Sequence, residues 1–195
     1  MIYLDNNATT PTDPRVVEAM LPYFYEHPGN AASRNHPFGW AAEEAVDYAR
    51  EQIANLINVD AKEIIFTSGA TEANNMVLFS LLHKRQNRRI LISGVEHASV
   101  YEPAQILKRL GFEVVQVPAD NKGRIDPGRI RGALDERTVA VAVMLVNNET
   151  GRIQPVREIA AVLREYQERS GKKILLHTDA VQAVGRIPLD MTKSH

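Results

Sequence analysis

The chain of 195 residues contains no cysteine. Disulfide bonds, thiolate zinc sites and a cysteine nucleophile are therefore excluded within it. Its longest apolar runs, such as residues 139–146, are far shorter than the roughly 20 residues of a membrane-spanning helix. The first residues show no basic segment followed by an apolar core, so they predict no secretory signal.

An excess of charge of either sign is also missing, because 23 Lys and Arg balance 24 Asp and Glu and leave a net charge of −1. This balance removes the electrostatic reason to expect a nucleic-acid or anionic-membrane partner. A hydrophobic fraction of 44% and a charged fraction of 24% are ordinary globular values. We expect a soluble, cytoplasmic protein that binds no nucleic acid and no membrane.

Short apolar runs alternate with stretches of helical spacing along most of the chain. The predicted strands are residues 63–67, 89–93, 112–117, 139–146 and 173–178. The predicted helices are residues 14–24, 41–57, 76–82, 103–110 and 125–134, with another after Pro155. Strands that alternate with helices and are apolar on both faces indicate an α/β fold: three layers, with a mostly parallel sheet flanked by helices.

Ligands of such sheets bind beyond the carboxyl ends of the strands, where two segments could serve the two ends of one ligand. Residues 67–75 are small and precede a predicted helix, so their N–H groups could bind a phosphate, with the Thr71 hydroxyl as a further donor. A simple helix cap explains the same residues. Asp179 ends a predicted strand and could hold a protonated ring nitrogen, with Gln182 beside it, although a capping Asp is equally ordinary.

Two further segments lie at the same predicted edge. His97 follows the strand at 89–93 and could stack on a planar ring or move a proton, or could simply cap a helix. Residues 146–151 contain adjacent amides that could fix ring substituents or make a tight turn before Gly151. No group of His, Asp and Glu has metal-ligand spacing, and no Walker pattern is present.

Together, the four segments suggest a phosphate cradle, a stacking imidazole, an amide and an acid at one sheet edge. A phosphorylated, protonated aromatic cofactor needs these groups, and pyridoxal 5'-phosphate (PLP) fits, because an adjacent Asp keeps its ring nitrogen protonated. A generic nucleotide-binding domain has little support, since no Gly-x-Gly-x-x-Gly pattern follows the first strand.

The sequence resembles the N-terminal half of the cysteine desulfurases, which belong to the class V aminotransferases, PLP enzymes of fold type I. The resemblance covers nearly the whole chain. It is carried by residues 3–11 (YLDNNATTP), 29–36 (GNAASRNH), 38–46 (FGWAAEEAV), 66–75 (FTSGATEANN), 96–97 (EH), 147–151 (NNETG) and 177–182 (HTDAVQ). It implies the large domain of a PLP-dependent transferase, present here only in part.

The resemblance also implies roles for individual residues. Ala70 and Thr71 would bind the phosphate, His97 would stack on the ring as the catalytic histidine, and Asn148 would contact the cofactor or the substrate carboxylate. Asp179 would pair with the ring nitrogen and Gln182 with the ring hydroxyl. The residues that border the substrate site would be Asn6, Ala8 and Thr9.

The implied reaction converts L-cysteine to L-alanine and passes sulfur to an acceptor such as an iron–sulfur scaffold protein, for cluster or thio-cofactor synthesis. The family's Schiff-base lysine, its persulfide-forming cysteine and its small domain fall beyond residue 195. Lys193 stands in a context that matches the segment before the family's lysine motif, so we do not assign it that role. We therefore expect a truncated or split part of the enzyme, inactive alone.

In domain terms, residues 1–13 would be the segment that borders the substrate site, and residues 14–195 the N-terminal part of the large domain. The expected partner is a second copy in a homodimer or a complementing C-terminal chain. Alternatives are another class V lyase, such as a selenocysteine lyase, or a non-catalytic remnant that binds a partner through its sheet edge.

Overall fold

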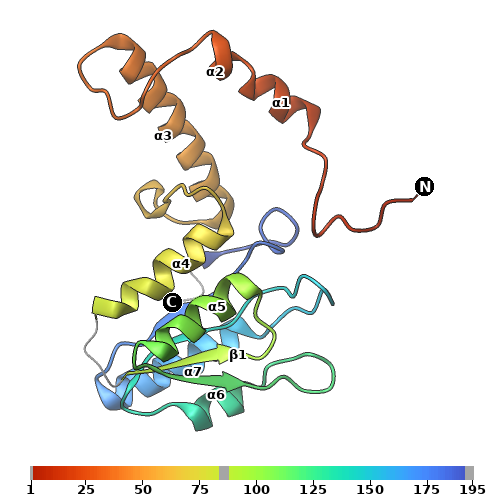
Figure 1. Ribbon diagram of the computed structural model, residues 1–195, viewed down its shortest axis with the longest axis vertical. Coiled ribbons are helices and arrows are strands. Elements are labelled where there is room, and N and C mark those ends of the chain that lie inside the picture. Colours follow the sequence, from red (N-terminus) through yellow and green to blue (C-terminus); the bar gives the residue numbers. More distant parts are fainter. Residues whose placement is uncertain (1, 84–87, 192–195) are drawn as a thin grey trace. The chain divides into compact units, whose positions relative to one another are not determined.

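The computed structural model describes residues 2–83 and 88–191 (Figure 1). The chain divides into two compact units, Met1–Ile65 and Phe66–His195, and each is described by itself. This division by contacts lies elsewhere than the predicted boundary after residue 13, which was drawn from implied function and stays a prediction.

The first unit is helical. Residues 14–24 form two short helices, α1 (Pro14–Met20) and α2 (Pro22–Tyr25), so the prediction of one helix was wrong. The cause is Pro22, which has no N–H for a bond one turn back and so begins a new helix instead. Asp13 caps α1 by accepting a hydrogen bond from the Arg15 N–H at 2.9 Å.

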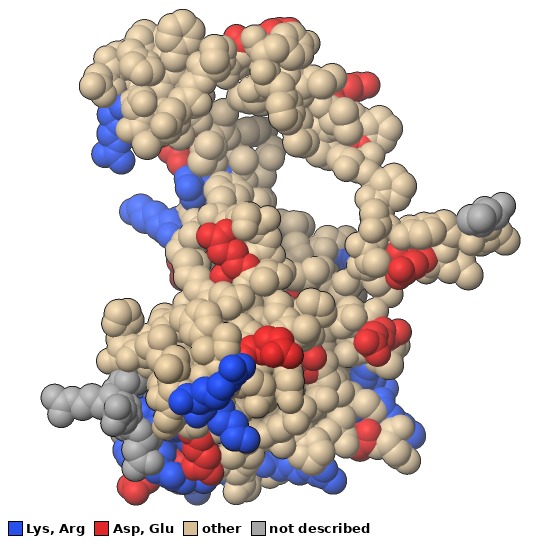
Figure 2. Space-filling model, in the orientation of Figure 1, with Lys and Arg blue, Asp and Glu red and all other residues tan. Residues whose placement is uncertain are grey.

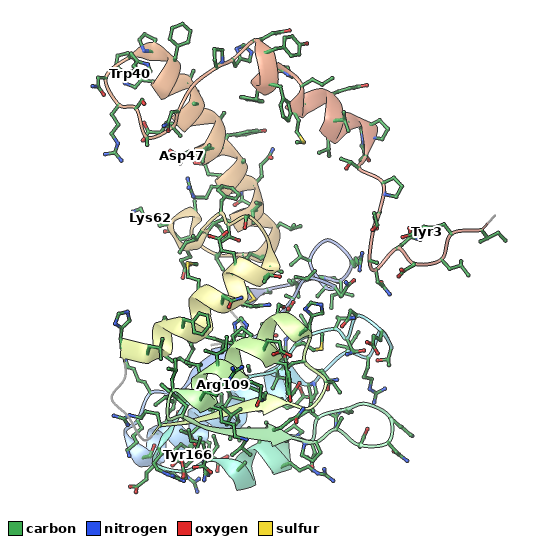
Figure 3. All side chains as sticks on the ribbon, viewed as in Figure 1. Tyr3, Trp40, Asp47, Lys62, Arg109 and Tyr166 are labelled. Atoms are coloured by element: carbon green, nitrogen blue, oxygen red, sulfur yellow. The ribbon has the colours of Figure 1, made fainter. Side chains whose placement is uncertain are left out.

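The long helix α3 (Pro37–Ile57) begins four residues before the predicted start. The ring of His36 accepts a hydrogen bond from Gly39 N at 3.1 Å, and Pro37 suits the first helical position. The indole of Trp40 donates to the carbonyl of Arg34 at 2.7 Å (Trp40 is labelled in Figure 3). The helix ends at Asn58, whose left-handed conformation stops it.

The strand predicted at 63–67 does not form. Its beginning belongs to the 3-10 helix η1 (Ala61–Glu63), and residues 64–67 have no regular structure. Ile64 has extended dihedral angles, but its carbonyl accepts a bond from Arg50 at 3.3 Å instead of from a strand. Ile65 and Phe66 stay 69% and 47% exposed. The prediction was wrong because an extended apolar segment becomes a strand only beside a neighbour that completes its hydrogen bonds.

The second unit contains a parallel sheet, which confirms the α/β class and four of the five predicted strands. In the described residues its strand order is β2-β1-β3-β4. Ile90 pairs with Val114 on one side and with Ala140 on the other. The strands are β1 (Arg89–Ser93), β2 (Glu113–Val117), β3 (Thr138–Ala142) and β4 (Leu175–His177).

Helices cover both faces of this sheet (Figure 1). Ile90 and Ile92 pack in one apolar cluster with residues of α4 and α5, whereas Leu91 packs in a second cluster with residues of α6 and α7. This alternation follows the two-residue period of a strand and makes the three layers. The helices are α4 (Ala70–Ser80), followed by η2 (Leu81–His83), α5 (Ala98–Arg109), α6 (Pro127–Ala133) and α7 (Val156–Ser170).

Strand β1 lies between β2 and β3, and the chain leaves β1 and β3 toward helices on opposite faces. The chain therefore leaves these two neighbouring strands in opposite directions at the carboxyl edge of the sheet. Open α/β sheets bind their ligands at such a reversal of strand order. The topology thus predicts a ligand site formed by the residues after Ser93 and after Ala142.

In the part of the chain that the structure describes, none of the helices combines the length and the apolar character needed to cross a membrane. Positive and negative side chains are interspersed on the face of the second unit shown in Figure 2.

Candidate active site

The carboxyl group of Glu96 joins the segments that follow β1 and β3. Its Oε1 accepts hydrogen bonds from the Ser93 hydroxyl and, at 2.7 Å, from the backbone N–H of Met144. The amide of Asn147 adds a bond to the Val95 carbonyl at 3.1 Å. Burial raises the pKa of Glu96, and the negative charge of Asp179 adds to this increase, while the two hydrogen bonds oppose it.

Asn74, on the first turns of α4, connects three other elements through its side chain. Its Nδ2 donates to the Ser99 hydroxyl at 2.9 Å and to Oδ2 of Asp179 at 2.9 Å. Its Oδ1 lies 3.0 Å from Nε2 of His177. Asn74, Ser99 and Asp179 are only 4%, 7% and 8% exposed, so this polar cluster lies inside the protein.

His97 is the N-cap of α5 and is exposed to solvent. Its Nδ1 accepts a hydrogen bond from Ser99 N at 3.1 Å and lies 2.8 Å from the Ser99 hydroxyl oxygen. His97 therefore caps α5, which was one of the alternatives that the sequence left open. Because Nδ1 is occupied as an acceptor, the neutral ring carries its hydrogen on Nε2.

Asp179 follows β4 and uses both carboxylate oxygens. Oδ1 accepts from Val181 N at 3.0 Å, and Oδ2 accepts from Asn74. The backbone carbonyl of Asp179 accepts from Leu145 N at 2.8 Å, which ties this residue to the segment after β3. Gln182, three residues later, accepts a hydrogen bond from Arg186.

The ring of His177 is the third member of the Asn74 cluster. Burial lowers the pKa of His177, and the nearby charge of Asp179 partly opposes this effect. A neutral imidazole at this position donates from Nε2 to the Asn74 oxygen.

The start of α4 presents backbone N–H groups that have no partner within the helix. Gly69 is the N-cap, without a side-chain cap bond, so Ala70 and Thr71 are the first two helical residues, and their N–H groups have no partner within the helix. Ser68 is already engaged, because the Glu72 carboxylate accepts from its N–H at 2.7 Å and from its hydroxyl at 2.6 Å. These bonds hold the pKa of Glu72 below its ordinary value. An anion would therefore meet the N–H groups of Ala70 and Thr71 rather than Ser68.

Residues 147–151 do form the tight turn that the sequence allowed. Oδ1 of Asn147 accepts from the backbone N–H groups of Glu149 and Thr150, at 3.1 and 2.9 Å. Gly151 completes the turn with a φ of 68°. Asn148 is half-buried beside it.

The predicted substrate-side residues Asn6, Ala8 and Thr9 belong to the first unit and are exposed. Ala8 N and Thr9 N donate to the Asp5 carbonyl at 3.2 and 3.3 Å, which makes a local turn. Their assignment to the substrate site stays a prediction. Lys193 lies outside the described residues.

Sequence reasoning did not single out Asn74, Ser99 or His177 as site residues. A signal for Asn74 was available, because it stands four residues before Leu78 on the face of α4 that is buried. A polar residue on the apolar stripe of a helix needs a buried partner. For Ser99, near the start of α5, and His177, at the end of β4, we see no comparable pattern.

The cluster brings the two ends of the predicted ligand site together. Thr71 and Asn74 are three residues apart in one helix, or about 4.5 Å along its axis. Asn74 in turn bonds Asp179 directly. The anion donors at the start of α4 and the buried carboxylate of Asp179 are thus linked through one side chain, as the phosphate and the protonated nitrogen of one ligand would require.

Comparison with known proteins identifies the family of the chain. The model of the aminotransferase class-V family matches residues 2–195. This chain belongs to that family. Members of this family are PLP-dependent enzymes.

The similar curated sequences are named as cysteine desulfurases. The cysteine desulfurase IscS of Anaeromyxobacter sp. (strain K) is 46% identical over 192 residues, which cover 97% of this chain and 46% of that protein. The mitochondrial cysteine desulfurase of Saccharomyces cerevisiae is 45% identical over 194 residues, covering 98% of this chain and 38% of that one. The chain thus spans about half the length, or less, of the curated relatives it matches.

Solved structures of other proteins have the same fold. A NifS-like protein superposes with a TM-score of 0.91 at 36% identity. The match covers 100% of this chain and 52% of that protein's chain. The structure described as SspA in complex with cysteine has a TM-score of 0.90 at 29% identity, over all of this chain and 55% of that one.

Proposed function

We propose that this class V chain supplies the cofactor-holding part of a PLP-dependent cysteine desulfurase. The reaction would convert L-cysteine to L-alanine and transfer the sulfur toward iron–sulfur cluster or thio-cofactor synthesis. The observation that carries the proposal is the bond of Asp179 to Asn74, which ties a buried carboxylate to the helix whose first N–H groups would bind the phosphate.

In this proposal the N–H groups of Ala70 and Thr71 bind the cofactor phosphate at the positive end of the helix dipole. The carboxylate of Asp179 holds a proton on the ring nitrogen. PLP supplies an electron sink for the substrate when it is bound. The remaining cofactor contacts are proposed for His97 as the stacking and proton-transferring group, for Asn148, and for Gln182 at the ring hydroxyl.

L-Cysteine is the proposed substrate, since cysteine is the ligand named for the neighbour SspA and the related sequences are desulfurases. Asn6, Ala8 and Thr9 would border its site. A sulfur-acceptor protein and a second copy of the chain, or a complementing C-terminal chain, are the proposed partners, and the cytoplasm is the proposed location.

We also propose that the 195-residue chain alone binds PLP through non-covalent contacts and does not turn over cysteine. Covalent PLP chemistry uses a lysine amine, and desulfuration uses a thiolate. The sequence has no cysteine, and no lysine in the sequence context of the family's lysine.

The test is a titration of the 195-residue chain with PLP, followed by absorbance and by quenching of protein fluorescence. Asp179→Asn is expected to weaken binding about tenfold or more, because the neutral amide no longer pairs with the protonated nitrogen. Asp47→Asn, an exposed change on α3, is the matched control. The proposal fails if the original chain binds no PLP, or if Asp179→Asn binds it as tightly. Steady sulfide release from L-cysteine by the isolated chain would contradict the proposed lack of turnover.

A further inference from the structure

We propose that Asn74 is the positioning residue of this site, whose single amide fixes the carboxylate of Asp179 and the imidazoles of His97 and His177 relative to the anion-binding end of α4. The inference deepens the proposed function and rests on it for the identity of the ligand. The hydrogen-bonded cluster itself is a property of the chain.

The orientation of the Asn74 amide follows from its neighbours. An ionised carboxylate only accepts hydrogen bonds, so the atom that faces Oδ2 of Asp179 at 2.9 Å is the NH2 group. That group has two hydrogens, and the second points to the Ser99 hydroxyl at 2.9 Å. Its oxygen is then left for Nε2 of His177 at 3.0 Å. Each polar atom of the amide therefore has a defined partner.

The first consequence concerns His97. Because the Ser99 oxygen accepts from Asn74, its own hydrogen is free to donate to Nδ1 of His97, 2.8 Å away. The backbone N–H of Ser99 donates to the same nitrogen. Two donors on Nδ1 keep the hydrogen of the neutral ring on Nε2 and hold the plane of the ring.

The second consequence concerns the spacing of the two ligand ends. Asn74 is fixed to Thr71 by the rigid helix α4, and it is hydrogen-bonded to a carboxylate at the end of β4. Any shift of α4 along its axis would stretch this bond. The amide thus acts on a ligand indirectly, through Asp179 and His97, by setting where these side chains lie.

The test uses the 195-residue chain and Asn74→Asp, which keeps the shape of the side chain but replaces the NH2 group with oxygen. Asn75→Ala is the matched control, since the Asn75 amide donates within α4, to the Thr71 carbonyl at 2.6 Å. The first readout is the imidazole 15N spectrum, which reports the tautomer and titration of each histidine without any ligand. In Asn74→Asp, we expect the His177 titration midpoint to rise, because its Nε2 now faces a carboxylate. The His97 signals should also shift, because the Ser99 hydroxyl then donates to the new carboxylate and only the Ser99 N–H still donates to Nδ1.

The second readout is binding of 4'-deoxypyridoxine 5'-phosphate, which has no aldehyde and binds only non-covalently. Asn74→Asp should weaken it about tenfold, since Asp179 loses its donor and gains a like charge beside it. Asn75→Ala should leave both histidine signals in place. If the original chain fails to bind the probe, the proposed function fails, and the histidine spectra alone decide the role of Asn74. If Asn74→Asp leaves the histidine spectra unchanged, or if it binds the probe as tightly as the original chain does, the inference is overturned.

Discussion

The buried carboxyl of Glu96 shows how a single side chain can hold a site together at a cost in stability. Oε1 ties the Ser93 hydroxyl to the backbone of Met144, whereas Oε2 is buried and has no hydrogen-bond partner among residues 2–83 and 88–191. An ionised oxygen without a partner is penalised more than a neutral one. Burial accordingly raises the pKa of this group above its ordinary value of 4.5.

A consequence for pH dependence follows at Glu96. In the window between the ordinary pKa and the raised one, the folded chain binds more protons than the unfolded chain, so its stability falls as pH rises. We expect Glu96→Gln to remove this fall and to be more stable than the original chain at pH 8, with little difference at pH 4. Urea unfolding at both pH values measures it, with the exposed Glu102→Gln as control. A Glu96→Gln variant that loses stability equally at both pH values would contradict the argument.

At the scale of elements, the start of α3 depends on a close approach that only glycine permits. A Cβ on Gly39 would lie 1.7 Å from the backbone oxygen of Ser33, so the loop before the helix would have to move. Gly132, in α6, has nothing within 4 Å of the same position. A side chain at Gly39 would therefore clash with the backbone, whereas a side chain at Gly132 would meet no neighbouring atom.

We expect Gly39→Ala to destabilise the start of α3 by about 1–3 kcal/mol, the usual effect of overpacking. Gly132→Ala, in contrast, should stabilise α6 by about 0.5–1 kcal/mol, because alanine loses less backbone entropy in a helix. Hydrogen exchange of the peptides that cover the two helices compares them directly. The exchange rate of each helix is compared with that of the same helix in the original chain. Faster exchange at α6 in Gly132→Ala, or unchanged exchange at α3 in Gly39→Ala, would contradict the prediction.

At the scale of the whole molecule, the edge of the sheet opposite the site is held by charges. Arg89, at the start of β1, contacts Glu113 of β2 at 2.7 Å and Asp135 at 3.1 Å, just before β3. Arg137 contacts the same two carboxylates at 2.7 and 2.9 Å. The hydrogen bond from Arg89 lowers the pKa of Glu113. Burial raises that of Asp135, but hydrogen bonds from Arg137 and Thr138 outweigh it and leave the pKa below its ordinary value.

This cluster should contribute to the loss of stability in acid. Between the ordinary pKa values and the lowered ones, the unfolded chain binds more protons, so stability falls as pH decreases through that window. The double variant Glu113→Gln with Asp135→Asn is expected to be less stable at pH 7 and to lose less stability on acidification. Urea midpoints from pH 7 to pH 3 measure the slope, with Glu168→Gln on α7 as control. An unchanged slope in the double variant would contradict the assignment.

Much of the second unit was predictable because local patterns and tertiary structure agree there. The apolar run around Ile90 predicts a strand, and its alternate residues do enter two different clusters. The segment around Ile64 has a similar pattern but forms no strand, since nothing in a local pattern tells whether a neighbour will be present. Helix ends were also displaced, as at Pro37 and Pro22, where caps and proline chemistry act over one or two residues.

The sequence by itself determined the α/β class, the family and the segments where chemistry is expected, because strand period, helix period and ordered motifs are all properties of the linear chain. Only the tertiary structure showed that Asn74 connects Ser99, His177 and Asp179, residues that stand 25 to 105 positions away along the chain. A hydrogen bond depends on distance and direction in space. Folding of the sheet and of α4, rather than any spacing in the sequence, brings these polar groups to one place.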